Sequence, residues 1–207
     1  MTFKVHDYYF KKAKEENFLA RSVYKLEEIN KKYKVLKKND VVLDLGYYPG
    51  SWIQYTSSVI GAQGKILGVD LQEVNKDLAH LKNVSLIQED VFALTPEKVA
   101  ALPFQFKLPF DVVLSDMAPK TSGIRSVDQD RSLDLVQKIF TLLPHFLKKS
   151  GNIVIKVFAS QIAQDYLKEQ KKQFKDWHYL RPASTRSCSK EFFVIGKGYL
   201  ASGENSG

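Results

Sequence analysis

Short apolar runs alternate with amphipathic segments along most of this chain. Residues 41–46, with the sequence VVLDLG, are almost all apolar and end in glycine, which is typical of a strand buried on both faces of a sheet. Further strands of this kind are predicted over residues 65–70, 84–90, 111–117 and 152–158. Apolar residues at helical spacing predict helices over residues 18–33, 51–61, 130–149 and 161–174. This alternation indicates βαβ units and a mostly parallel sheet with helices on both faces.

The C-terminal part of the chain departs from this alternation. Residues 177–182 and 191–199 both read as strands, and no helical pattern separates them, so one of the two is expected to run antiparallel. Residues 95–109 hold three prolines and predict a connection with a short helix. We find no linker, so residues 1–200 are predicted to form one α/β domain. The tail over residues 201–207 is expected to be disordered.

Composition narrows the class of protein. The 207 residues are 44% hydrophobic and 26% charged, as in ordinary globular proteins. The N-terminus lacks an apolar signal segment, and no run approaches the ~20 apolar residues of a membrane span. Cys188 is the only cysteine, and the four histidines lack the spacing of metal ligands. We therefore expect a cytoplasmic protein with no metal site and no membrane partner.

The charge of the chain is uneven. The net charge is +8, and residues 1–40 and 168–200 each carry +5, around a middle segment that is close to neutral. A basic field of this kind attracts polyanions such as nucleic acid. The alternative is that the lysine-rich segments are ordinary solvated helix faces.

Four acidic residues fall at the ends of predicted strands: Asp44, Asp70, Asp90 and Asp116. In a doubly wound sheet, ligands bind beyond the carboxyl ends of the strands. The first loop, residues 46–51, matches neither a phosphate-binding loop nor a dinucleotide fingerprint, so a nucleoside without a pyrophosphate fits better. Asp70 stands where an acid can bind a ribose diol, and Asp90 where an acid can bind an adenine amino group. The alternative is that these acids only cap loops.

Lys156 interrupts the apolar run over residues 153–158. An isolated buried ammonium is very costly, so this lysine must be paired or neutral. Asp116 ends one neighbouring strand and Glu191 begins another, so both carboxylates could orient it. The alternative is a lysine that reaches solvent from the end of the strand.

The chain resembles the RrmJ/FtsJ family of ribosomal RNA ribose 2′-O-methyltransferases. The resemblance covers roughly residues 6 to 200. The segments that carry it are RSVYKLEEI (21–29), DLGYYPGSW (44–52), GVDL (68–71), QED (88–90), SDMAPKTSG (115–123), IVIKVF (153–158) and TRSCSKEFFVIGKG (185–198). The resemblance implies a Rossmann-like class I methyltransferase fold with seven strands, of which one is antiparallel.

The resemblance also implies a site and a reaction. The family's Lys–Asp–Lys–Glu tetrad corresponds here to Lys25, Asp116, Lys156 and Glu191. The implied S-adenosyl-L-methionine pocket is lined by Gly50, Trp52, Asp70, Asp90 and Asp116. The implied substrate is the 2′-hydroxyl of a uridine in large-subunit ribosomal RNA, in a large-subunit particle. We expect a monomer that does not act on DNA.

One departure from the family concerns Tyr47 and Tyr48, where the family more often has two alanines. Two phenol rings could narrow the donor pocket, or point outward and stack on RNA bases; we expect at least one to point outward. The alternatives to the main interpretation are a ribose methyltransferase of transfer RNA and a non-catalytic RNA-binding protein with a decayed donor site.

Overall fold

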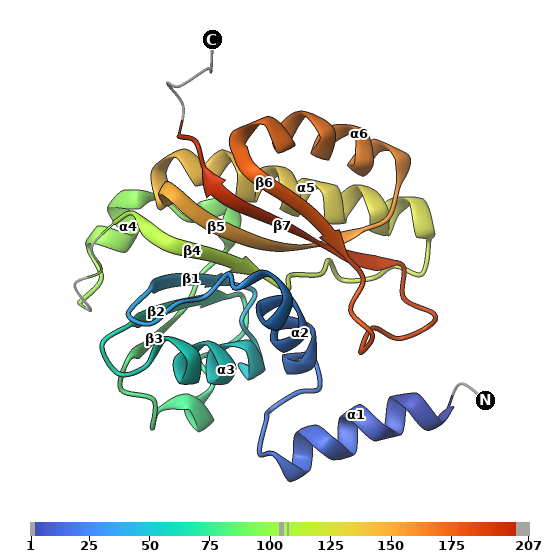
Figure 1. The fold of residues 1–207 in the computed structure, drawn as a ribbon, viewed down its shortest axis with the longest axis horizontal. Coiled ribbons are helices and arrows are strands. Elements are labelled where there is room, and N and C mark those ends of the chain that lie inside the picture. The colour runs from blue at the N-terminus through green and yellow to red at the C-terminus, as the bar shows by residue number, and fades with distance from the viewer. Residues whose placement is uncertain (1–2, 104–105, 107, 202–207) are drawn as a thin grey trace.

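A computed structural model describes residues 3–103, 106 and 108–201, with side chains from residue 8 onward. Seven strands form a single sheet in the order β3-β2-β1-β4-β5-β7-β6 (Figure 1). The strands are β1 (Val41–Leu45), β2 (Lys65–Asp70), β3 (Val84–Gln88), β4 (Phe110–Ser115), β5 (Leu147–Phe158), β6 (Phe174–Leu180) and β7 (Glu191–Tyr199).

Helices lie on both faces of the sheet. The α-helices are α1 (Phe3–Glu15), α2 (Val23–Tyr33), α3 (Ser51–Ile60), α4 (Pro96–Ala100), α5 (Arg125–Phe146) and α6 (Gln161–Gln170). The 3-10 turns are η1 (Lys76–Leu78), η2 (Val91–Ala93) and η3 (Lys171–Gln173). Figure 1 shows α2 and α3 on one face, α5 and α6 on the other, and α1 standing apart from the sheet.

The strand directions confirm the predicted topology. Parallel ladders join β1 to β2 and β4, β2 to β3, and β4 to β5. Strand β7 runs antiparallel to both β5 and β6, so the last two strands form the expected closing pair. Because β7 is reversed, its first residue lies beside the last residue of β5, in the pair Phe158↔Glu191. The carboxyl ends of β4 and β5 and the beginning of β7 therefore meet at one edge.

Each face of the sheet has its own core. Ile153 and Ile155 of β5 pack with α5 and α6, whereas Val154 packs with α2 and α3. Side chains alternate between the faces of a strand, so Lys156, two residues after Val154, belongs to the α2 and α3 face. Phe193 of β7 also belongs to that core. The alternation thus directs the buried lysine towards α2.

The structure departs from the predicted boundaries at several places. Strand β5 begins at Leu147, where a helix was expected up to residue 149, and α6 ends at Gln170 rather than at residue 174. Helix α1 has no counterpart among the predicted elements, and it holds three aromatic residues in succession at positions 8–10. Helix α2 begins at Val23 rather than at residue 18, after a turn in which the Leu19 main-chain N–H donates to Gln54 Oε1 at 2.9 Å. Helix α5 begins at Arg125 rather than at residue 130, where polar residues fill its first turn.

Two further sequence predictions concern membrane spans and the extent of the domain. Within the described residues, no helix is both long and apolar enough to cross a bilayer. All but the first residue of the predicted tail lie outside the described residues, and the assignment of residues 1–200 to one domain stays a prediction.

Candidate active site

Two ion pairs lie side by side along the strand-end edge. Lys156 Nζ lies 3.0 Å from Asp116 Oδ1, and it also donates to the Asp116 main-chain carbonyl. Lys25, from α2, forms the second pair with Glu191 at the start of β7. The side chains of Lys156 and Glu191 are only 8% and 11% exposed. Each buried cation therefore has its own carboxylate, as burial of charge demands.

This pairing differs from the sequence expectation in one respect. Asp116 orients Lys156, as expected, but Glu191 pairs with Lys25. The four residues of the predicted tetrad are nevertheless brought together from α2, β5, β7 and the end of β4. The sequence could not assign the carboxylates to the lysines, because the choice depends on how α2 lies across the sheet.

Two aromatic side chains, Phe193 and Trp52, pack against each other next to the two ion pairs. Phe193 is the cross-strand neighbour of Lys156, and its ring centroid lies 5.7 Å from Lys25 Nζ. Trp52 packs on Phe193 with ring centroids 5.8 Å apart, and its indole N–H donates to the Ser22 carbonyl at 2.9 Å. Trp52 is 2% exposed. It therefore fixes the beginning of α2, and through α2 it fixes Lys25.

A cleft of about 380 Å³ opens beside these pairs, and we call it the strand-end cleft. Its lining comes from the loops that follow β1, β2, β3 and β4, with one residue of α5. The lining residues are Gly46, Tyr48, Val69, Asp70, Leu71, Gln72, Glu89, Asp90, Val91, Phe92, Asp116, Met117, Ala118 and Leu135. Asp116 both lines the cleft and holds Lys156, so the cleft and the ion pairs form one site.

The acids of the cleft are held by main-chain N–H groups. Asp70 accepts from Tyr48 N at 3.0 Å and from Gln72 N at 2.9 Å, which joins two of the cleft's loops. Asp90 caps η2 by accepting from Phe92 N at 2.9 Å. A carboxylate oxygen can accept more than one hydrogen bond, so both acids keep capacity for a ligand's hydroxyl or amino groups.

Asp44, beneath the cleft, is a buried acid that sequence reasoning placed at a strand end but did not assign to the site. It is 1% exposed, and neither carboxylate oxygen has a hydrogen-bond partner among the described residues. Burial raises the pKa of Asp44 well above its usual range, and the nearby carboxylates of Asp116 and Asp70 raise it further. The carboxylates of Asp70 and Asp116, close to this buried acid, favour cationic ligands at this edge of the sheet.

The cleft fits S-adenosylmethionine on several counts. Asp70 at the end of β2 can bind a ribose, and Asp90 after β3 can bind a base that carries an amino group. Leu71 and Phe92, which are 61% and 53% exposed, offer apolar surface to that base. The orphaned Asp44 and its neighbour Asp116 suit a molecule with cationic sulfonium and ammonium groups. No group of three or more metal-ligating side chains occurs in the part of the chain that the structure describes.

Two predicted cofactor residues lie outside the lining of the cleft. Gly50 directly precedes α3 with φ of +118°, and a Cβ at this position would collide with the Leu78 side chain. Trp52 lies in the core beneath. Gly46 lines the cleft instead, with φ of +77°, and a Cβ there would collide with Met117. Glycine is needed at Gly46 for both reasons.

The two tyrosines of the first loop point in different directions. Tyr47 is 2% exposed and belongs to the α2 and α3 core, whereas Tyr48 is 51% exposed and lines the cleft. One ring therefore faces outward, as expected. Tyr47 fills space in the core beside Gly68, whose missing side chain leaves room for the ring.

The fold and the site together define a methyltransferase with a doubly wound sheet and S-adenosylmethionine as methyl donor. The family model of the FtsJ-like methyltransferases matches residues 18–199, so this chain belongs to that family.

Similar proteins share nearly the whole chain. Ribosomal RNA large subunit methyltransferase E of Bdellovibrio bacteriovorus is 48% identical over 95% of this chain and 98% of its own. The enzyme of the same name from Syntrophobacter fumaroxidans is 42% identical over 95% of this chain and 97% of its own.

Solved structures share the fold. A Plasmodium falciparum protein assigned as a ribosomal RNA methyltransferase has a TM-score of 0.76 at 26% identity, covering 89% of this chain and all of its own. Aeropyrum pernix fibrillarin, solved with natively bound S-adenosyl-L-methionine, has a TM-score of 0.56 at 20% identity, covering 78% of this chain and 68% of its own. At that identity the second likeness shows the fold alone.

We predict that Asp44→Asn reduces the pH dependence of stability. A carboxyl whose pKa is raised by folding binds its proton more tightly in the native state than in the unfolded state, where the pKa is about 3.9. The wild-type free energy of unfolding should therefore fall as pH rises above about 4 towards the raised pKa. The variant should lack this fall in urea-unfolding measurements across that range.

Thr56→Val is the matched control for this prediction. Thr56 is also fully buried with an unpartnered side-chain oxygen among the described residues, but it does not titrate. Its variant should keep the wild-type pH dependence. An unchanged pH dependence in Asp44→Asn would mean that this carboxyl does not retain its proton in the folded protein.

Proposed function

We propose that this protein transfers a methyl group from S-adenosylmethionine to a ribose 2′-hydroxyl in ribosomal RNA of the large subunit, at a uridine. The observation that carries the proposal is the position of Asp116, which lines the strand-end cleft and also holds Lys156. A donor in the cleft would thus lie beside a lysine that can act on an incoming hydroxyl. The names of the curated relatives support large-subunit ribosomal RNA as the substrate.

Positioning accounts for much of the proposed catalysis. When bound, S-adenosylmethionine supplies an activated methyl group on a sulfonium. Asp70 and Asp90 would hold its nucleoside end, and Asp116 its amino group. Gly50 and Trp52 do not line the cleft. They would support donor binding indirectly, by holding the first loop and α3 in place. When both reactants are held in line, the bimolecular step becomes effectively unimolecular, which lowers the entropic part of the barrier.

Lys156 is the proposed general base. In its neutral form, Nζ would accept the proton of the 2′-hydroxyl as the oxygen attacks. The Asp116 carboxylate at 3.0 Å and the Asp116 carbonyl hold the nitrogen in place from one side. The remaining direction at Nζ is then left for the substrate. This role requires a lysine whose position does not vary, which its burial provides.

Lys25 and Glu191 are proposed to act on the RNA. Lys25 would contact the target ribose or its phosphate, and Glu191 would keep the Lys25 ammonium directed at that position. Trp52 and Phe193 support this arrangement from below. Each of the four proposed catalytic residues therefore has an assigned role. This argues against the alternative of a non-catalytic RNA-binding protein with a decayed donor site.

The partner proposed for this site is RNA in a large ribosomal particle. The +5 charge of each end of the chain supports a polyanionic partner. We further propose that the protein acts as a monomer in the cytoplasm and does not modify DNA. The direct test is to offer the protein unmethylated large ribosomal subunits, free ribosomal RNA and transfer RNA, and to map ribose methylation by mass spectrometry. Methylation of transfer RNA alone would overturn the proposal.

We predict that Lys156→Ala lowers the rate of methyl transfer by at least about a hundredfold, the usual contribution of a general base. The donor dissociation constant, measured by calorimetry, should stay within a fewfold of wild type, because Lys156 does not line the cleft. Circular dichroism should establish that the variant is folded, since Asp116 loses its buried partner.

The matched control for this variant is Lys148→Ala. Lys148 lies on the same strand, forms an ion pair with Asp111, and is 48% exposed at the far end from the site. Its variant should transfer methyl groups at the wild-type rate. A folded Lys156→Ala variant with full activity would remove this lysine from the mechanism.

We predict that Tyr48→Ala weakens RNA binding about tenfold and leaves donor affinity nearly unchanged. Its half-exposed ring can stack on an unpaired base, an interaction worth roughly 1–3 kcal/mol. Tyr48→Phe should restore binding, and Tyr179→Ala, at an exposed tyrosine on β6, should not alter it. Tighter donor binding with unaltered RNA binding would show instead that Tyr48 crowds the donor.

A further inference from the structure

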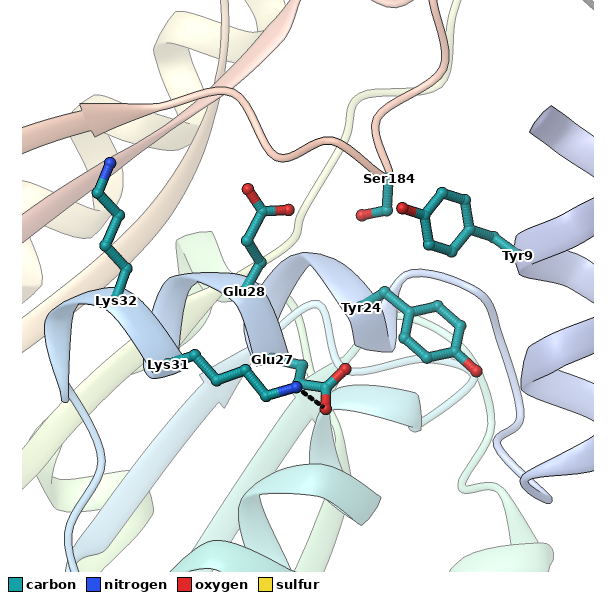
Figure 2. A pocket seen from close by; sticks show the side chains of 7 residues that line it. All are labelled: Tyr9, Tyr24, Glu27, Glu28, Lys31, Lys32 and Ser184. Atoms are coloured by element: carbon teal, nitrogen blue, oxygen red, sulfur yellow. Dashed lines mark hydrogen bonds and ion pairs between the residues drawn. The ribbon is translucent and has the colours of Figure 1, made fainter.

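A second hollow, which we call the side cavity, lies between α1, α2 and the loop that joins β6 to β7. It encloses about 450 Å³, within the range of about 300–1,000 Å³ that is typical of ligand pockets. Figure 2 shows its lining residues: Tyr9, Tyr24, Glu27, Glu28, Lys31, Lys32 and Ser184. Helix α2 supplies five of the seven.

The side cavity adjoins the candidate active site through α2. Lys25 follows Tyr24 directly in sequence and precedes Glu28 by one helical turn. The loop that supplies Ser184 leads, a few residues later, into Glu191, the partner of Lys25. An RNA strand whose target ribose lies at Lys25 would therefore pass its neighbouring nucleotides over this hollow.

The charges that line the side cavity cancel. Lys31 Nζ donates to Glu27 Oε1 at 2.7 Å, and Glu28 Oε2 accepts from the Ala183 main-chain N–H at 2.8 Å. With Lys32, the lining holds two cations and two anions. A strongly charged occupant would gain nothing from such a lining, whereas an uncharged ring with both donors and acceptors would find partners for both.

An unpartnered hydroxyl gives the cavity a polar contact point. Ser184 is 2% exposed, and its Oγ has no hydrogen-bond partner among the residues that the structure describes. Figure 2 shows this side chain entering from the loop, next to the Tyr9 side chain that enters from α1. A buried hydroxyl without a partner costs stability unless a ligand satisfies it.

The same end of the cavity carries an aromatic face and a cationic rim. The Tyr9 ring lies 5.4 Å from that of Tyr24 and 5.6 Å from the guanidinium of Arg21. Arg21 also donates to the Ser184 carbonyl at 2.6 Å. Burial, and then the like charge of Arg186, lower the pKa of Arg21. A guanidinium group such as that of Arg21 binds phosphate well.

We propose that the side cavity binds one unpaired nucleotide next to the target nucleotide, with its base against Tyr9 and Ser184 and its phosphate near Arg21. This inference rests on the proposed function, because it assigns the cavity to the same RNA strand. The polar lining, whose charges cancel, favours an uncharged base, and the rings of Tyr9 and Tyr24 provide the apolar contact. The guanidinium of Arg21, beside Tyr9 and Ser184, would contact the backbone of the strand.

The main test compares three variants on α1 by their affinity for a transcript of large-subunit ribosomal RNA. Tyr9→Ala should weaken RNA binding about tenfold, as loss of one base–aromatic stack does. Tyr9→Phe keeps the ring and should bind almost as wild type. Phe10→Ala, at a neighbouring residue that is 57% exposed but outside the cavity, should bind as wild type. Donor affinity should be the same in all three.

Photo-crosslinking gives a second readout that does not depend on how Tyr9→Ala folds. A transcript that contains 4-thiouridine should crosslink, in the wild-type protein, to the peptide that holds Tyr9 or to the one that holds Ser184. Ser184→Ala should lower RNA affinity severalfold. If it instead raises thermal stability and leaves RNA affinity unchanged, the hydroxyl has no part in binding and the proposal is overturned.

The outcomes separate this inference from the proposed function. If the wild-type protein methylates ribosomal RNA but crosslinks only outside the cavity, or if Tyr9→Ala binds RNA as wild type, the nucleotide site is wrong and the function stands. Equal losses in Tyr9→Ala and Phe10→Ala would also overturn the site, since they would indicate general contact along α1. If the wild-type protein transfers no methyl group to ribosomal RNA, the function itself fails.

Discussion

A lysine inside a β-strand must meet an opposite charge, and the arrangement of this site follows from that requirement. The side chain of Lys156 is 8% exposed, on a strand whose other buried residues are apolar except for Asn152. Parallel pairing of β4 with β5 brings Asp116 to it at the strand-end edge. Removal of one partner from a buried pair typically costs about 3–5 kcal/mol. The pair therefore fixes the lysine, and through Asp116 it ties the lysine to the strand-end cleft.

The second ion pair depends on a different contact, between α2 and α3. Trp52 donates to the Ser22 carbonyl, and the hydroxyls of Ser22 and Ser51 lie 2.9 Å apart, so the beginnings of the two helices are joined. This junction sets where Lys25 lies above the sheet. A tryptophan in the first-loop motif can thus serve the site without lining the cleft, by holding the helix that carries a lysine.

Periodicity made much of this organisation predictable, whereas contacts between distant elements did not follow from the sequence. Apolar runs located the strands and the helices between them, and acids at strand ends were expected at one edge, where Asp70, Asp90 and Asp116 do line one cleft. Helix α1, by contrast, packs Tyr9 and Ala13 against Val23 and Tyr24 of α2, and the pattern of the α1 segment alone does not encode that contact. The pairing of Glu191 with Lys25 depends on the position of α2, which no local pattern encodes. The inward turn of one loop tyrosine depends likewise on space left by a glycine in the neighbouring strand.

Electrostatics at the cleft favours binding of the methyl donor over binding of the product. The donor carries a positive sulfonium, whereas the product that remains after methyl transfer is an uncharged thioether. A cleft lined by Asp70 and Asp116, with Asp44 buried near them, favours the charged form over the neutral one. Burial raises the pKa of Asp44, and a cationic ligand bound nearby should lower that pKa because it favours the charged carboxylate. The buried acid would then strengthen the hold on the donor and weaken the hold on the product.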